Sequence, residues 1–293
     1  MTNGIRPLRN QRLKRPGDLR KGILRRHIAL PTEHGAWIWW IGPLLIGAAA
    51  GEQRNADVAV LFLTALAAFL ARHPLTLLVK VRSGRRSTRD LAPAAFWAGL
   101  YSFLASAGVI LLLLKGHGRV LWLAVPGLPV FAWHLWLVNQ RAERGQRAIE
   151  LAVSGVLSLT APAAYWLAQG NGLMEPWLLW LLTWLQTAAS IVHVYLRLEQ
   201  RRLDQMPSMP ERWRMGTRSL LYHSFNLLLS LSLALSGLFD LPFLVPGAYA
   251  LLFLDAFAGV VHPAVGAKPS AIGLRQLAAS SIFVLMMILA YSL

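Results

Sequence analysis

Cysteine is absent from the 293 residues, which excludes disulfide bonds, a thiolate nucleophile and cysteine-ligated zinc or iron–sulfur centres. Charged residues are scarce as well, at 14% of the chain, against roughly 25% in a typical soluble domain. Acidic residues are the rarest of these, with 13 Asp and Glu against 29 Lys and Arg. Because 56% of the residues are hydrophobic, this composition excludes a soluble globular enzyme, a disordered chain and a fibrous protein.

The apolar residues form nine long segments. Most of them contain about 20 residues, enough for a helix to cross a hydrocarbon core of about 30 Å. We therefore predict an all-α polytopic membrane protein with about nine transmembrane helices in the lipid bilayer. The segments are 35–51, 56–80, 91–114, 119–139, 148–168, 173–196, 219–238, 241–262 and 274–292.

Lysine and arginine are concentrated in the N-terminal tail and in alternate connectors, whereas the other connectors contain only Arg54, Lys115 and Arg119. Because basic connectors stay in the cytoplasm, we predict a bacterial inner-membrane protein with a cytoplasmic N-terminus and an external C-terminus. Residues 1–30 are expected to form a basic cytoplasmic tail, without the apolar stretch of a signal peptide. Residues 31–293 then form one transmembrane domain. The net charge of +16 reflects topology and attraction to anionic lipid rather than nucleic-acid binding.

Ionisable and polar residues inside the segments gather near the predicted cytoplasmic side. Counting 1.5 Å per residue places them within about 10 Å of that interface, and charges at membrane depth normally face a bundle interior or a cavity. We therefore predict a polar pocket that is open to the cytoplasm and closed on the outer side by apolar packing. Its candidate residues are Glu33, His34, Arg72, His73, His134, Asn139, Glu150, His193, Arg197, Glu199, His223, Asn226, Asp255 and His262.

Helical spacing favours convergence of several of these side chains. His193 and Arg197 share a face at i,i+4, and Asp255 and His262 are seven residues apart. A polar stripe in the seventh segment contains Ser219, His223, Asn226 and Ser230. Each residue also has a purely structural interpretation, as a tie between helices or as a side chain that extends to lipid phosphate. Residues typical of an interfacial aromatic belt are Trp37, Trp39, Trp40, Trp177, Trp180 and Trp184.

Two short repeats suggest an internal duplication. Val125-Pro126-Gly127 recurs as Val245-Pro246-Gly247, 120 residues later, and the same offset relates His73 to His193. The pattern fits two four-helix halves, segments 2–5 and 6–9, in addition to the first segment. His73 and His193 would then face each other across the pocket, and the two prolines would kink their helices at matching heights.

The stretch Leu30-Pro31-Thr32-Glu33-His34-Gly35-Ala36-Trp37 resembles the signature of the YwiC-like family of bacterial membrane proteins. Two later stretches also resemble that family, Ala71-Arg72-His73-Pro74 and Ala267-Lys268-Pro269-Ser270-Ala271-Ile272-Gly273. The family is defined by sequence, so the resemblance implies a membrane protein and no particular reaction.

A second resemblance is architectural. Nine spans, a cytoplasmic pocket and two halves are similar to a UbiA-like bundle, that of the UbiA-type intramembrane prenyltransferases. Those enzymes have aspartate-rich motifs at the ends of spans 2 and 6, whose carboxylates hold Mg²⁺ and thereby an isoprenyl diphosphate. This chain differs, because the matching part of span 2 has no carboxylate and only Glu199 and Asp204 follow span 6.

Cationic residues stand in place of those carboxylates and could bind phosphate directly. The first hypothesis is therefore a prenyltransferase-like membrane enzyme that acts on a lipid or isoprenoid with an anionic head, with no metal site or cofactor assigned. Candidate catalytic residues for proton transfer are Glu33, His34, His73, His193 and Asp255. Candidate substrate-binding residues are Arg72, Lys80, Arg197, Glu199, Arg201, His223, Asn226 and His262.

Three alternatives stay open at this point. A transporter or anion-binding protein could use the same pocket, although transporter sites usually lie at the bilayer midplane. A non-catalytic membrane subunit or assembly factor would need the polar residues only to tie helices together, and the sequence names no protein partner. A metal or haem site could be formed by His73, His193 and His223.

Overall fold

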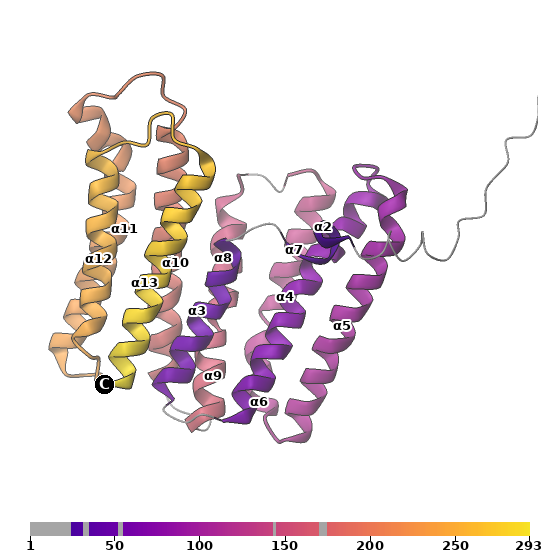
Figure 1. The fold of residues 1–293 in the computed structure, drawn as a ribbon. Coiled ribbons are helices and arrows are strands. Elements are labelled where there is room, and N and C mark those ends of the chain that lie inside the picture. The colour runs from indigo at the N-terminus through magenta and orange to yellow at the C-terminus, as the bar shows by residue number, and fades with distance from the viewer. Residues whose placement is uncertain (1–24, 32–34, 52–54, 143–144, 170–174) are drawn as a thin grey trace, which may run out of the picture.

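The structure is a computed structural model that describes residues 25–31, 35–51, 55–142, 145–169 and 175–293. All regular secondary structure in these ranges is helical (Figure 1). Eight helical segments are long and apolar enough to cross a membrane, and a ninth apolar helix, α3, contains 16 residues. The predicted all-α, polytopic fold class is therefore confirmed.

The helices follow the predicted apolar segments closely. In chain order they are α2 (Arg26–Ala29), α3 (Gly35–Ala50), α4 (Ala56–Arg82), η1 (Thr88–Asp90), α5 (Leu91–Leu114), α6 (Gly118–Leu121), η2 (Trp122–Ala124), α7 (Gly127–Asn139), α8 (Arg147–Ser158), α9 (Thr160–Gln169), α10 (Glu175–Gln200), α11 (Met209–Ser236), α12 (Leu244–Val261) and α13 (Pro269–Ser292).

Helix α11 begins at Met209, ten residues before the predicted segment. The Glu211 carboxylate accepts hydrogen bonds from the Ser208 backbone N–H at 2.9 Å and from its hydroxyl at 2.8 Å. This is a capping box, which satisfies free donors at a helix start. Hydropathy marks only the part of a helix that lies in lipid, so it missed the polar first turns of α11.

The fourth and fifth membrane segments are interrupted. The fourth consists of α6, η2 and α7, with Pro126 as the residue before α7. The fifth is divided between α8 and α9 at Leu159, where Pro162 has no N–H to donate to the preceding turn. Pro246, by contrast, lies in the first turn of α12, where no such bond is lost. The predicted matching kinks at Pro126 and Pro246 are therefore wrong.

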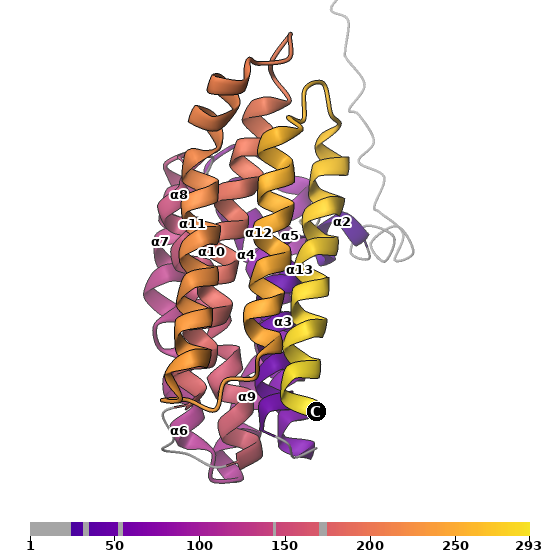
Figure 2. The same ribbon diagram turned by 90° about the vertical axis from the view of Figure 1, so that its left-hand side faces the viewer.

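Helix α3 lies between the two groups of helices. Helices α4–α7 form one side of the molecule and α10–α13 the other, with α3, α8 and α9 between them (Figure 1). Figure 2 shows the α10–α13 group side by side in front of the rest. Helix α3 packs on α9 and on α13, so the first segment joins the two sides instead of standing apart from them.

Each side has its own apolar core, and α3 contributes to both. Trp40 and Leu44 pack with α4 and α9, whereas Ile46 packs with α12 and α13. Glycines allow the close approach: a Cβ on Gly47 would lie 2.0 Å from the carbonyl oxygen of Ala161 in α9. Small residues at helix contacts are typical of membrane bundles, where van der Waals packing drives association.

The basic connectors lie at one end of the bundle, which we call the basic end. The connections α4–α5, α7–α8, α10–α11 and α12–α13 all turn there, and α2 lies beside them (Figure 1). Of the Lys and Arg residues that the structure describes, Lys115 and Arg119 lie at the opposite end. The charge alternation along the sequence is thus a separation of charge between the two ends of the fold.

Candidate functional site

A cavity of about 1120 Å³, which we call the central cavity, lies between α3, α4, α7, α8, α10 and α13. Its walls come from the helix ends nearest the basic end: the C-terminal parts of α4, α7 and α10 and the N-terminal parts of α3, α8 and α13. Helices from both sides of the molecule therefore enclose it. Its main polar wall residues are Arg72, Lys80, His134, Glu150, Ser190 and Tyr195.

The cationic wall of the central cavity is formed by α4. Arg72, Thr76 and Lys80 follow one another at i,i+4 spacing, so they share one helix face, and all three line the cavity. The Arg72 guanidinium also lies 5.4 Å from the centre of the Phe69 ring. The sequence predicted Arg72 and Lys80 as substrate-binding residues, and the structure places both on the same wall.

An acidic residue and a tyrosine face this wall from α8 and α10. The Tyr195 hydroxyl donates a hydrogen bond of 2.8 Å to the Glu150 carboxylate, and both residues line the cavity. The Arg147 guanidinium stacks 4.8 Å above the Tyr195 ring. Sequence reasoning missed Tyr195, because a tyrosine near a helix end is ordinarily an interfacial anchor. The sequence signal that could have identified Tyr195 is its position two residues after the candidate His193, on another face of the same helix.

The rest of the central cavity wall is mostly apolar. Its apolar residues include Ile38 and Trp39 from α3, Val153 from α8, and Ile191 and Val194 from α10, whereas α13 adds the polar residues Ser270, Gln276 and Ser280. A cavity with one cationic wall and several apolar walls matches an amphiphile, a molecule with an anionic head and an apolar chain.

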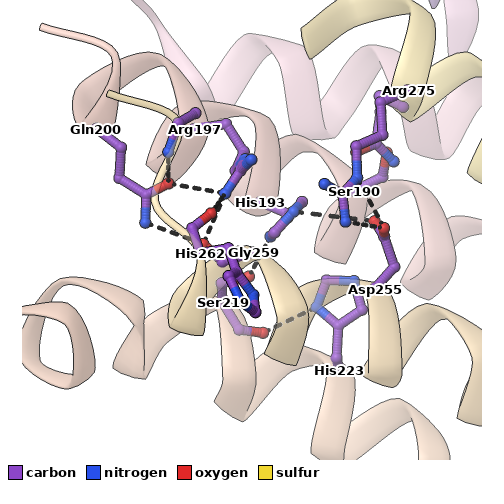
Figure 3. Close-up of polar contacts among 12 residues, drawn as sticks. Ser190, His193, Arg197, Gln200, Ser219, His223, Asp255, Gly259, His262 and Arg275 are labelled. Atoms are coloured by element: carbon purple, nitrogen blue, oxygen red, sulfur yellow. Dashed lines mark hydrogen bonds and ion pairs between the residues drawn. The ribbon is translucent and has the colours of Figure 1, made fainter. Parts of the chain in front are cut away.

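A separate network of buried polar side chains lies between α10, α11, α12 and α13 (Figure 3). His193 Nδ1 lies 3.0 Å from the Ser219 hydroxyl, and His193 Nε2 lies 4.0 Å from the Asp255 carboxylate. His223 Nδ1 donates to the Ser219 backbone carbonyl at 2.8 Å. A Cβ on Gly259 would lie 2.6 Å from His193 Cε1, so only glycine leaves room for this imidazole.

Asp255 is neutralised by an arginine from α13. The Arg275 guanidinium donates to one Asp255 oxygen from Nε at 2.9 Å and from Nη2 at 2.6 Å. Together with His193 and Arg197 these residues line a small cavity of about 200 Å³. Ser219 does not line that cavity and is 1% exposed, so the Ser219–His193–Asp255 alignment does not present a nucleophile to a substrate.

Arg197 and Arg201 bind backbone carbonyl groups of α12 and of the connection that follows it. Arg197 Nη1 donates to the Gly259 and His262 carbonyls, both at 2.7 Å, and Arg201 Nε donates to the Ala267 carbonyl at 3.0 Å. The last carbonyls of a helix have no partner within it, so Arg197 caps α12, whereas Arg201 holds the connection between α12 and α13. Neither arginine lines the central cavity, in contrast to their predicted role in holding a headgroup.

The structure does not bring His73 and His193 together. His73 Nε2 lies 3.1 Å from the His27 carbonyl of α2, and neither histidine lines the central cavity. The predicted pair across one pocket is therefore wrong, because His73 and His193 belong to different packing environments. A histidine triplet that includes His223 fails for the same reason.

The remaining predicted residues are spread over several settings. Glu199 and the side chain of His262 are exposed. Asn226 is buried and donates to the Leu185 carbonyl at 2.9 Å. Glu33 and His34 lie outside the described residues.

The donor set of the central cavity does not fit the Mg²⁺ site of the enzymes that the architecture resembles. Among the described residues that line the cavity, Glu150 is the one carboxylate, and Tyr195 already donates to it. Across the described ranges, no three His, Asp or Glu side chains lie close enough together to hold a metal ion. The clustered carboxylates with which those enzymes hold Mg²⁺ therefore have no counterpart among the described residues of this cavity.

Comparison with known proteins agrees with the first resemblance. The family model for YwiC-like proteins matches residues 30–165. The chain is also similar to the uncharacterized protein YwiC of Bacillus subtilis (strain 168), with 28% identity over 150 residues. That match covers 50% of this chain and 57% of the relative, so the chain spans just over half of the relative's length. No solved structure matches the chain significantly.

Proposed function

Residues 30–165 of this multi-pass membrane protein are YwiC-like, and from this premise we propose a function that rests on the central cavity. The protein is a prenyltransferase-like membrane enzyme that binds a lipid or isoprenoid with an anionic head. We place it in the bacterial inner membrane, with the basic end in the cytoplasm, since basic connectors are retained there.

The observation that carries this proposal is the division of the central cavity into a cationic wall and apolar walls. Arg72 and Lys80 lie two turns of α4 apart, about 12 Å along the helix axis. A guanidinium binds phosphate oxygens through two parallel hydrogen bonds, and an ammonium adds a point charge. The apolar walls then accept the first part of the hydrocarbon chain.

The Glu150–Tyr195 pair supplies a group for proton transfer. In the proposed reaction, the bond between the isoprenyl carbon and the phosphate oxygen breaks, and the phosphate leaves with the electron pair, held by Arg72 and Lys80. The acceptor forms a bond to the isoprenyl carbon and loses a proton to Glu150. Tyr195 holds the carboxylate in place by the 2.8 Å hydrogen bond, as a general base requires a positioned acceptor.

Binding of farnesyl phosphate to the purified protein tests the headgroup assignment. We expect the double variant Arg72→Ala/Lys80→Ala to bind at least about 100-fold more weakly, because each charged hydrogen bond contributes about 1.5–3 kcal/mol. The measurement is native mass spectrometry in mild detergent, with thermal unfolding as a check on folding. The matched control is Arg82→Ala, which removes an exposed cation from the last turn of the same helix.

Equal binding by the double variant and the wild type would overturn the headgroup assignment. The same preparation tests the chemistry through pyrophosphate release from farnesyl diphosphate in the presence of a membrane lipid extract. Glu150→Gln should retain binding and lose release, whereas Glu199→Gln, a change at an exposed carboxylate on α10, should retain both. Release by Glu150→Gln at the wild-type rate would exclude Glu150 as the base.

A further inference from the structure

A second cavity, of about 740 Å³, lies toward the opposite end of the bundle. We call it the tryptophan groove, because five indoles from η2, α9 and α10 line it. They are Trp122, Trp166, Trp177, Trp180 and Trp184. The sequence predicted apolar packing on the outer side of the polar pocket and did not predict a second cavity there.

Two of the three groove-lining indoles of α10 donate their N–H groups to α8. Trp180 Nε1 donates to the Gly155 carbonyl at 2.9 Å, and Trp184 Nε1 donates to the Leu151 carbonyl at 3.0 Å. At the break between α8 and α9, the Leu159 N–H donates to the Val156 carbonyl instead of to the Gly155 carbonyl. The Gly155 carbonyl therefore has no partner within the helix and can accept from Trp180. The polar atoms of these rings are thus satisfied by protein.

The rings form a continuous aromatic wall. Trp166 and Trp177 pack edge to face with centroids 5.7 Å apart, and Trp177 packs in the same way on Trp180 at 6.2 Å. Trp180 stacks on Trp184 at 5.1 Å. Arg119, at the outermost part, is the one charged residue among the groove-lining residues that the structure describes. Such a wall suits a hydrocarbon chain and has few polar groups that could bind a headgroup.

Helix α10 borders both the groove and the central cavity. Trp177, Trp180 and Trp184 line the groove, and Ile191 and Tyr195 continue the same helix face into the central cavity at spacings of three, four, seven and four residues.

Helix α8 repeats this pattern, since Val156 lines the groove and Val153 lines the central cavity. Two helices, α8 and α10, thus border both cavities.

The distance between the two cavities sets the chain length that a shared ligand needs. From Tyr195 to Trp177 is 18 residues, or about 27 Å along α10, which is close to the full hydrocarbon thickness of about 30 Å. A phospholipid chain reaches only through its own half of the bilayer. A ligand with its head at Arg72 needs a longer chain to reach Trp177.

We propose that the tryptophan groove holds the distal part of the chain of the same ligand whose anionic head lies in the central cavity. The substrate class is then a long polyprenyl phosphate or diphosphate, and not a phospholipid. This inference rests on the proposed function. The other possible occupant is a second lipid from the opposite leaflet with its head at Arg119.

Binding of geranyl phosphate and of solanesyl phosphate separates these possibilities. The wild type should bind the long-chain compound at least about tenfold more tightly; the gain comes from packing, because the chain is already in an apolar medium when it is free. Ala152→Phe, which fills the groove from α8, should abolish this gain and leave geranyl phosphate binding unchanged. Ala107→Phe adds the same ring at an exposed position of α5 and should change neither affinity.

A second variant guards against misfolding of the first. Trp122→Ala/Trp177→Ala removes two partly exposed rings from the groove, and we expect it to weaken only solanesyl phosphate binding, by several-fold. Equal wild-type affinity for the two phosphates, or full solanesyl phosphate affinity in both groove variants, would overturn the inference and leave the headgroup site intact.

Two further outcomes identify other failures. Loss of solanesyl phosphate binding in Arg119→Gln, with none in Arg72→Ala/Lys80→Ala, would assign the groove to a separate lipid and overturn the inference. A wild type that binds neither phosphate would overturn the proposed function and, with it, this inference.

Discussion

At the scale of single residues, Arg72 and Arg197 show that one residue type near the basic end serves two purposes. Arg72 lines the central cavity beside Thr76 and Lys80. Arg197 is 9% exposed and donates to the Gly259 and His262 carbonyls. In the sequence, both stand near the predicted cytoplasmic end of an apolar helix. The difference depends on what lies across from each side chain, which is α12 for Arg197 and a cavity for Arg72.

Replacing Arg197 distinguishes a capping residue from a ligand-binding residue. Arg197→Ala leaves two carbonyl groups and the Gln200 side chain without their charged donor, so we expect it to destabilise the protein by about 3 kcal/mol. Thermal unfolding in detergent should show a lower melting temperature than for Arg202→Ala, a change at an exposed neighbour. Farnesyl phosphate binding by the folded fraction should stay unchanged.

The opposite pattern, in which Arg197→Ala keeps wild-type stability and loses farnesyl phosphate, would return Arg197 to the headgroup site. The sequence could not separate these outcomes, because spacing along α10 places Arg197 on a face but does not reveal the carbonyl groups that the neighbouring helix presents.

At the scale of elements, α3 is the helix on which the two sides of the molecule depend. With 16 residues it is shorter than each of the eight membrane-spanning segments, and it packs against α9 and α13. The packing is close because Gly42 faces Val284 and Gly47 faces Ala161. The sequence predicted this helix as a span in addition to two halves, but its place between them follows only from the contacts.

A methyl group at Gly47 tests this packing. The Cβ would lie 2.0 Å from the Ala161 carbonyl oxygen, which belongs to the backbone and has little freedom to move. We expect Gly47→Ala to destabilise the protein by about 1–3 kcal/mol, seen as a lower melting temperature. Gly99→Ala in α5 meets nothing within 4 Å and should be neutral or slightly stabilising. Equal melting temperatures for the two variants would contradict the close α3–α9 contact.

At the scale of the whole molecule, charge and cavities are arranged along the same axis. The basic connectors and the central cavity are at one end, and the tryptophan groove, with Arg119, is toward the other. For the ligand that we propose, the anionic head then lies at the end with the cationic wall and the chain follows α8 and α10. This polarity gives the proposed ligand one orientation.

The absence of cysteine makes the orientation in the membrane directly measurable. A single cysteine at Gln205, in the exposed connection between α10 and α11, reports on the basic end, and one at Asp240, between α11 and α12, reports on the other. In intact cells, a membrane-impermeant maleimide should label Asp240→Cys and not Gln205→Cys, because basic connectors face the cytoplasm. Labelling of Gln205→Cys alone would reverse the orientation, and the unmodified chain gives a background without thiols.

The sequence by itself determined the helical membrane fold, the approximate bounds of nine apolar helices and the alternation of basic connectors. These properties are local: each follows from the hydropathy or charge of one stretch, and a helix in lipid satisfies its own backbone hydrogen bonds. The same local reading placed Arg72 and Lys80 near one end of α4. It also supplied the YwiC-like motif, which the match over residues 30–165 confirms.

Only the tertiary structure decided which polar residues share a cavity. The count from each span end gave heights in the membrane but not the rotation or the neighbours of each helix. For that reason His73 and His193, at similar predicted heights, lie in different environments, while Tyr195 joins Glu150 across two helices. The tryptophan groove has the same origin, since it exists where η2, α8, α9 and α10 meet without filling the space between them.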